Sequence, residues 1–182
     1  MSENKDIWIK TGYEIFALNG ENSLKIESLA KKVGISKSSF YHHFADMEVF
    51  IELLMNYHLQ QSEIIACKEK AVKTIDPELI NILVEHKTDL LFNRHLRFNH
   101  QNKIYKLTLD KSNRIIGSEF VKLWAADTKL NLNHKQLEGL FELALENFFL
   151  LINSENLNSK WLSDYFINLK RIAMNFELSI VR

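Results

Sequence analysis

The 182-residue sequence contains only one proline, five glycines and one cysteine. Strand-rich folds need frequent turns, and turns depend on glycine and proline, so this scarcity favours long helices joined by short polar links. The single cysteine, Cys67, excludes a disulfide within the chain. The composition therefore predicts an all-α protein.

Long apolar runs are also missing. The longest are fragments such as residues 148–152, well short of the roughly 18 apolar residues that indicate a membrane span. The first residues include Glu3 and Asp6 and lack the positive charge and apolar run of a secretory signal. We therefore expect a cytoplasmic protein that has no membrane partner.

The chain has no excess of positive charge, because 23 basic residues balance 23 acidic ones. Nucleic-acid-binding domains commonly carry a basic excess, so the overall composition does not indicate one. The local charge differs: residues 25–44 contain four lysines and a single acid, Glu27. A DNA-binding function must therefore rest on the arrangement of this segment.

No catalytic or metal-binding constellation is evident in the sequence. His86 and Asp89 stand about one helical turn apart and His95 and His100 follow, but no second pair or cysteine completes a ligand set. Cys67 has no adjoining nucleophile motif, and no glycine-rich phosphate loop occurs. We expect no metal, no cofactor and no enzymatic activity, with a helical-bundle enzyme as an alternative.

Apolar residues recur at helical spacing along most of the chain. Gly20 and Gly34 are placed to end helices, while Ser36, Asp46 and the Asp76-Pro77 pair are placed to begin them. Besides a short helix that follows Ser36, the pattern predicts helices over residues 4–19, 26–33, 47–74, 77–92, 99–110, 113–130, 134–153 and 158–180.

Residues 26–44 have the pattern of a helix-turn-helix, in which one helix supports a second that fits a major groove about 12 Å wide. The expected shared core comprises Ile26, Leu29, Ala30, Val33, Ile35, Phe40 and Phe44. The expected outward face, which can donate hydrogen bonds to phosphates and base edges, comprises Lys37, Ser38, Ser39, Tyr41, His42 and His43. The alternative is a helical hairpin whose lysines are merely solvated.

The same segment resembles a known family. Residues 8–16 and Gly20 precede the run LAKKVGISKSSFYHHF, whose Gly-Ile-Ser, Phe-Tyr and His-Phe elements are similar in identity and spacing to the DNA-binding domain of the TetR family. The resemblance implies a three-helix DNA-binding domain with a helix-turn-helix over residues 1–46. It also implies a C-terminal helical domain over 47–182 that binds an effector and dimerises, with 47–74 as a connecting helix.

By this resemblance, Lys37 and Ser38 meet base edges, and Ser39 contacts phosphate. Two positions depart from the family pattern: Lys25 replaces a capping hydroxyl, and Met47 replaces a phosphate-binding lysine. Lys25 can compensate as a point charge, so the predicted DNA-binding residues are Lys25, Lys37, Ser38, Ser39, Tyr41, His42 and His43. The departures leave open a helical interaction module that has lost DNA binding.

Two broad apolar stripes cover residues 137–152 and 162–176. The resemblance implies that they pack against a second copy in a four-helix bundle, and the alternative is burial within one subunit. The predicted dimer-interface residues are Leu137, Phe141, Leu145, Phe148, Leu162, Tyr165, Leu169 and Ile172.

The resemblance also implies a small-molecule effector of unknown identity. Ligand cavities are lined by apolar and aromatic side chains, and the candidates here are Phe92, Phe98, Tyr105, Phe120, Trp124 and Phe141. Residues 90–109 carry basic residues and no acid, which fits either an anionic effector or a solvated surface. The expected function is a homodimeric repressor that an effector releases from a palindromic operator in double-stranded DNA.

Overall fold

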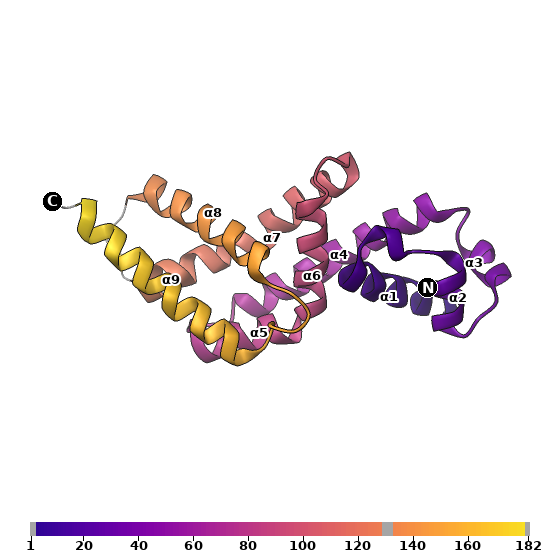
Figure 1. Ribbon diagram of the computed structural model, residues 1–182, viewed down its shortest axis with the longest axis horizontal. Coiled ribbons are helices and arrows are strands. Elements are labelled where there is room, and N and C mark those ends of the chain that lie inside the picture. The colour runs from indigo at the N-terminus through magenta and orange to yellow at the C-terminus, as the bar shows by residue number, and fades with distance from the viewer. Residues whose placement is uncertain (1–2, 129–132, 181–182) are drawn as a thin grey trace. The chain divides into compact units, whose positions relative to one another are not determined.

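The computed structural model describes residues 3–128 and 133–180, and every regular element in these ranges is helical (Figure 1). The elements are α1 (Glu3–Asn19), η1 (Glu21–Ser23), α2 (Ile26–Val33), α3 (Lys37–His43), α4 (Met47–Glu69), η2 (Ile75–Leu79), α5 (Ile80–Glu85), α6 (Lys87–Phe98), α7 (Lys103–Thr128), α8 (His134–Leu151) and α9 (Ser159–Ile180). The all-α prediction is confirmed. Among the described residues, no helix combines the length and apolar character needed to cross a membrane.

The chain divides into two compact units. The first comprises residues 1–63 and 88–113, and the second comprises residues 64–87 and 114–182. Helices α4 and α7 each contribute residues to both units. A functional boundary at residue 46 stays a prediction, because compactness does not define which residues bind DNA or effector.

Glycines end α1 and α2 as predicted. Gly20 (φ 77°) donates its N–H to the carbonyl oxygen of Phe16 at 2.8 Å, and Gly34 (φ 76°) donates to that of Ala30 at 2.9 Å. Both residues have a positive φ, which glycine adopts without the steric cost that a side chain would bring. The chain can therefore turn sharply at each point, which brings α1, α2 and α3 together.

The two predicted helix caps in this region differ in outcome. The Asp46 carboxylate accepts the backbone N–H of Val49 at 2.9 Å, which satisfies a free donor in the first turn of α4. Ser36 occupies the position before α3, but its side chain makes no capping bond. Its hydroxyl oxygen instead lies 2.8 Å from that of Ser38, so its predicted capping role is wrong.

Several later helix boundaries differ from the prediction. Helix α4 ends at Glu69 rather than at residue 74, and the predicted helix over 77–92 is interrupted at His86. Helix α7 (Lys103–Thr128) is continuous across the expected break between the predicted helices over 99–110 and 113–130, and residues 129–130 lie outside the described residues. Apolar residues keep their helical spacing both where a helix ends and where two predicted helices join, so periodicity alone could not locate the helix boundaries.

Asp76 does not cap the helix that follows it. Its carboxylate accepts a hydrogen bond from the Ser163 hydroxyl of α9. The Glu78 carboxylate, in the same segment, accepts the backbone N–H groups of Lys73 and Thr74, at 2.7 and 3.0 Å. The predicted role of Asp76 is therefore wrong, because a partner distant in sequence binds its carboxylate.

An aromatic cluster fixes α3 against α1 and α4. Trp8, Phe40, Phe44 and Phe50 are almost completely buried. The ring of Phe40 lies 5.4 Å from that of Trp8 and 5.2 Å from that of Phe50. Edge-to-face packing of this kind adds stabilisation beyond the area buried. The cluster therefore determines which face of α3 remains outward.

Helix α1 also approaches α4 very closely at Gly12. A Cβ atom on Gly12 would lie only 2.4 Å from Cζ of Phe50. Because the aromatic cluster surrounds Phe50, its ring has little freedom to move away, and we expect Gly12→Ala to destabilise the protein by about 1–3 kcal/mol. Urea unfolding measures this change. Gly139→Ala in α8 is the matched control. A Cβ atom on Gly139 would meet no heavy atom within 4 Å beyond its own helix backbone and chain neighbours, so this variant should be neutral or slightly stabilising.

A buried polar network joins α1, α4 and α6 in the first unit. The Tyr13 hydroxyl donates to the Asp89 carboxylate at 2.7 Å and lies 2.8 Å from Nδ1 of His58. Since the hydroxyl proton is used on Asp89, Nδ1 of His58 is the donor to the tyrosine oxygen. Tyr13 and His58 both stack on Phe92, at 4.3 and 4.7 Å. Burial lowers the pKa of His58 to about 4, so its ring is neutral near pH 7.

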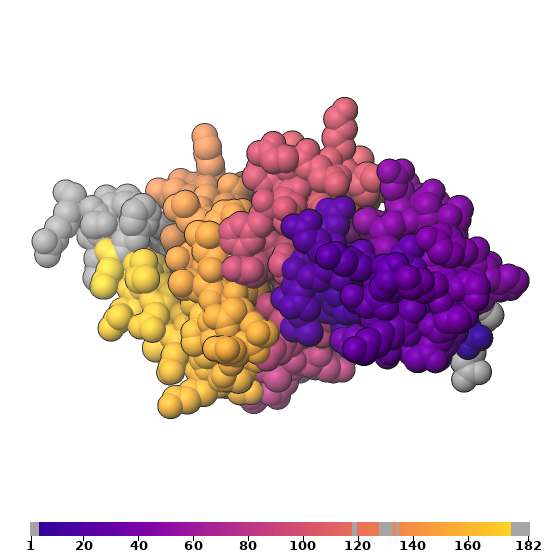
Figure 2. All heavy atoms as spheres, turned by 45° about the vertical axis from the view of Figure 1, so that its right-hand side comes forward, coloured from indigo at the N-terminus to yellow at the C-terminus, as the bar shows by residue number. Residues whose placement is uncertain are grey.

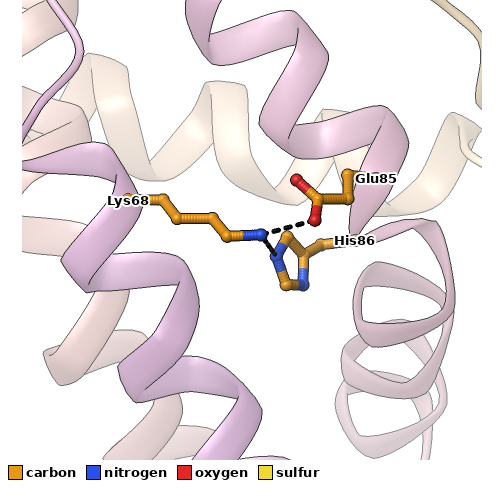
Figure 3. A network of polar contacts seen from close by, with 3 residues as sticks. All are labelled: Lys68, Glu85 and His86. Atoms are coloured by element: carbon orange, nitrogen blue, oxygen red, sulfur yellow. Dashed lines mark hydrogen bonds and ion pairs between the residues drawn. The ribbon is translucent and has the colours of Figure 1, made fainter.

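The second unit is held by contacts of α5, α8 and α9 and by the end of α4. Figure 3 shows Lys68 of α4, whose ammonium lies 2.6 Å from the Glu85 carboxylate and 3.0 Å from Nε2 of His86. Helix α5 packs against α9, and the Tyr165 hydroxyl of α9 donates to the carbonyl oxygen of Ala144 in α8 at 2.8 Å. The Tyr165 bond thus ties α8 to α9, the two helices that carry the predicted dimer residues.

Candidate nucleic-acid interface

The predicted helix-turn-helix forms from α2 and α3, which lie side by side in the first unit. Their expected shared core is divided between two levels of burial. The fully buried members are Leu29, Ala30, Phe40 and Phe44. The half-buried members are Ile26, Val33 and Ile35. The two helices therefore have the apolar back that the sequence predicted.

The opposite face of this segment is polar and open to solvent. The predicted DNA-binding residues that are exposed are Lys25, Lys37, Ser38, Tyr41 and His42, and those that are half-buried are Ser39 and His43. Tyr41 is 59% exposed although it is a large aromatic residue. Figure 2 shows the indigo-to-purple atoms of the N-terminal helices as one continuous region of the surface. The structure thus brings the seven predicted residues together on neighbouring elements, and their contact with DNA stays a prediction.

An ion pair spans the two helices of this face. The Lys37 ammonium lies 2.5 Å from the Glu27 carboxylate, and both side chains are more than half exposed. The hydrogen bond from Lys37 is the main reason that the pKa of Glu27 lies below its usual value. Glu27 is the one acid of residues 25–44, and the sequence pattern does not indicate its pairing with Lys37, because the two residues meet only when α2 and α3 pack.

The two departures from the family pattern have distinct positions. Lys25 precedes α2 in an extended conformation, and its exposed side chain makes no capping bond to the backbone. Met47 is the first residue of α4 and is half-buried. A lysine at position 25 is therefore available to a phosphate, whereas a methionine at position 47 cannot donate to one.

The ligand candidates of the first unit lie in different surroundings. Phe92 and Tyr105 are buried, with ring centres 4.4 and 5.7 Å from that of Phe16. Phe98 is 46% exposed, and the Arg94 guanidinium lies 4.6 Å from its ring centre. The exposure of Phe98 does not support the predicted role in lining a cavity. The structure assigns Phe92 and Tyr105 to the core of this unit.

The other three ligand candidates belong to the second unit. The ring of Phe141 in α8 lies 5.4 Å from that of Phe120 and 6.4 Å from that of Trp124, both in α7. Trp124 is buried, while Phe120 and Phe141 are half-buried. The six candidates therefore form two groups in separate units, and contact of either group with a ligand stays a prediction.

The predicted dimer residues range from buried to exposed. Phe148 and Leu162 are buried within their own unit and have little surface to offer a second copy. Leu137, Phe141, Leu145, Tyr165 and Leu169 are half-buried, and Ile172 is 57% exposed. The same helices also expose apolar residues that sequence reasoning omitted, namely Leu143, Leu150, Leu151, Ile167 and Met174. Because α8 and α9 carry apolar residues on more than one face, the pattern could not separate the inner from the outer face.

Comparison with known sequences agrees with this geometry. Residues 9–54 match the family model described as bacterial regulatory proteins, tetR family. The HTH-type transcriptional regulators YuxN and YerO of Bacillus subtilis (strain 168), both uncharacterized, are 32% and 36% identical to this chain over 62 residues. Each alignment covers 34% of this chain and 21% or 22% of the relative, so the match spans about a fifth of the relatives' length.

Solved structures extend the likeness to nearly the whole chain. A crystal structure from Rhodococcus sp., assigned to the TetR-family transcriptional regulators, superposes with a TM-score of 0.61 at 17% identity and covers 96% of this chain and 100% of that one. A second structure, from Mesorhizobium loti MAFF303099, superposes with a TM-score of 0.63 at 15% identity and covers 96% of this chain and 96% of that one. Fold and site thus define a helical protein with an N-terminal helix-turn-helix domain. Residues 9–54 match the TetR-family model, and the chain has the same fold as these two structures.

Proposed function

We propose that this protein is a repressor that binds a palindromic operator as a homodimer and is released by a small-molecule effector. The observation that carries the proposal is the outward polar face of α3, held in place by the buried aromatic cluster on its other side. The TetR-type domain over residues 9–54 supports this interpretation of the face. DNA is a partner that such a face can bind through hydrogen bonds and charge.

Each side chain of the face has a role that its chemistry suits. Lys37 and Ser38, at the start of α3, would meet base edges in the major groove, and Tyr41 and His42 would meet bases or backbone. Lys25, Ser39 and His43 would contact phosphates, which fix the orientation of the domain. The net charge of the chain is zero, so the local excess of lysine supplies the attraction to DNA.

A dimer would place two copies of α3 in successive major grooves, roughly 34–36 Å apart along the duplex. The exposed apolar residues of α8 and α9 support an interface with a second copy, since surfaces of this kind are normally covered. An effector that changes the separation of the two heads would prevent both from docking together. Release then follows from coupling between two sites rather than from direct competition.

The proposal is tested by measuring binding to duplexes from the region upstream of the protein's own gene, using fluorescence anisotropy. Lys37→Ala combined with Tyr41→Ala should weaken binding about 100-fold, because each lost base contact is worth about 1–3 kcal/mol. Lys103→Ala combined with Leu107→Ala is the matched control, since both residues are exposed on α7 of the same unit. The control should bind like the wild type.

Two results would overturn the proposal. The first is a wild-type protein that binds no duplex even at low salt, which would favour the helical interaction module instead. The second is equal loss of affinity in the α3 variant and the α7 control, which would place the binding surface elsewhere. Wild-type affinity should also fall steeply with salt, as expected when lysines displace counterions from phosphates.

A further inference from the structure

We propose that Glu27 is a specificity-determining residue of the DNA interface, which weakens binding to nonspecific DNA by holding Lys37. The inference rests on the proposed function and adds a discriminating element to the same face. It concerns a negatively charged side chain on a surface that is otherwise suited to meet phosphates.

The geometry places the Glu27 carboxylate within direct reach of the first residue of α3. Glu27 lies in the first turn of α2, and its Oε1 atom is 2.5 Å from Nζ of Lys37. Their side chains are 67% and 53% exposed, so neither is fixed by burial. The pair is therefore a charge-assisted hydrogen bond in solvent, which a competing acceptor on DNA can replace.

The Glu27 carboxylate is ionised at neutral pH, as exposed glutamates are, and the neighbouring lysines favour its charged form. The Lys37 hydrogen bond and the nearby charge of Lys25 both lower the pKa of Glu27. An exposed negative charge on this face repels the phosphate backbone. Nonspecific complexes depend almost entirely on phosphate charge, so they lose the most from this repulsion.

Nonspecific DNA and the operator differ in the hydrogen-bond acceptors that can replace Glu27 as the partner of Lys37. On nonspecific DNA, Lys37 leaves one anion, Glu27, for another, a phosphate, and the gain is small. An operator that places a guanine opposite Lys37 would present two acceptors, O6 and N7, in the major groove, and a lysine can bind both. Glu27 thus lowers nonspecific affinity more than operator affinity, which is a common way to obtain specificity.

The experiment compares Glu27→Gln with the wild type on a random-sequence duplex and on the bound upstream duplex, over a range of KCl concentrations. We expect nonspecific affinity to rise about fivefold and its dependence on log salt to steepen by about one unit, as for one added phosphate contact. Operator affinity should rise about twofold or less, so the specificity ratio falls.

Glu14→Gln is the matched control for a change of charge alone. Glu14 is 59% exposed and lies 4.0 Å from Lys32, so the variant removes one paired carboxylate from the same unit. We expect it to change nonspecific affinity by less than twofold. A second control places Glu27→Gln in a Lys37→Met background, where the gain in nonspecific affinity should largely disappear.

Three outcomes would overturn the inference: Glu27→Gln raises both affinities equally, Glu27→Gln behaves like Glu14→Gln, or its effect persists without Lys37. A wild-type protein that binds neither duplex would overturn the proposed function together with the inference. That result differs from the first three, in which the wild type binds DNA and only the comparison fails.

Discussion

His58→Asn should remove about 3 kcal/mol of the pH dependence of folding stability between pH 6.5 and pH 4. Burial lowers the pKa of His58 from 6.5 to about 4 in the folded protein, and the charge of Asp89 opposes this only in part. Between these two pH values the unfolded chain binds a proton at His58 and the folded protein does not. Stability due to His58 is therefore complete above pH 6.5 and is lost as the pH falls toward 4.

Asparagine is the informative replacement because it does not titrate and keeps a donor near the position of Nδ1. It can therefore still donate to the Tyr13 oxygen, while Tyr13 continues to donate to Asp89. We expect the variant to be less stable at neutral pH, since it loses the stacking of the His58 ring on Phe92. The diagnostic quantity is the slope of unfolding free energy against pH, obtained from urea titrations at several pH values.

His100→Asn is the matched control, because His100 is exposed and lies outside the buried network of Tyr13, His58 and Asp89. It should keep the wild-type slope. Burial also lowers the pKa of half-buried His95, so some pH dependence should remain in the His58 variant. A His58→Asn protein whose stability falls with acid as steeply as that of the wild type would refute the role of this buried ring.

Phe92→Ala should destabilise the protein by about 3–5 kcal/mol, which is the cost of removing a fully buried aromatic side chain. Phe92 has no exposed surface, and its ring packs within 4.3–4.7 Å of those of Tyr13, Phe16 and His58. Its loss leaves a cavity where α1, α4 and α6 meet. Urea or thermal unfolding measures the change in stability.

Phe98→Ala provides a matched comparison on the same helix, since it makes the same chemical change at a residue that is 46% exposed. We expect it to cost less than about 1 kcal/mol, because much of the ring is already in water. Equal destabilisation would mean that the burial of Phe92 is not what stabilises the junction of α1, α4 and α6.

The first part of the fold was the most accessible to sequence reasoning. Gly20, Gly34 and Asp46 act through bonds to neighbouring residues, so their roles follow from local chemistry and were predicted correctly. Ser36 and Asp76 have the right residue types for caps but bond to other side chains. Residue type therefore predicts a cap correctly only where no other side chain competes, whether the competitor is near in sequence, as Ser38 is for Ser36, or distant, as Ser163 is for Asp76.

The candidate interface shows the same division. The helical spacing of apolar residues predicted that Phe40 is buried and that Tyr41 lies on the exposed face, because a helix has a fixed period. The ion pair between Glu27 and Lys37 joins residues ten positions apart across a turn, and no periodic pattern indicates it. The burial of Phe148 and Leu162 likewise depends on which of several apolar faces turns inward.

Local sequence predicted that the chain is helical, where the first helices end, and which side of residues 26–44 is apolar, since these properties depend on neighbours within one or two turns. Helix packing alone brings Tyr13, His58 and Asp89 into one buried network and the Glu27 carboxylate against Lys37. The residues of each of these two groups lie on different helices. Their meeting depends on how the helices pack, because packing selects partners by shape and burial rather than by distance along the chain.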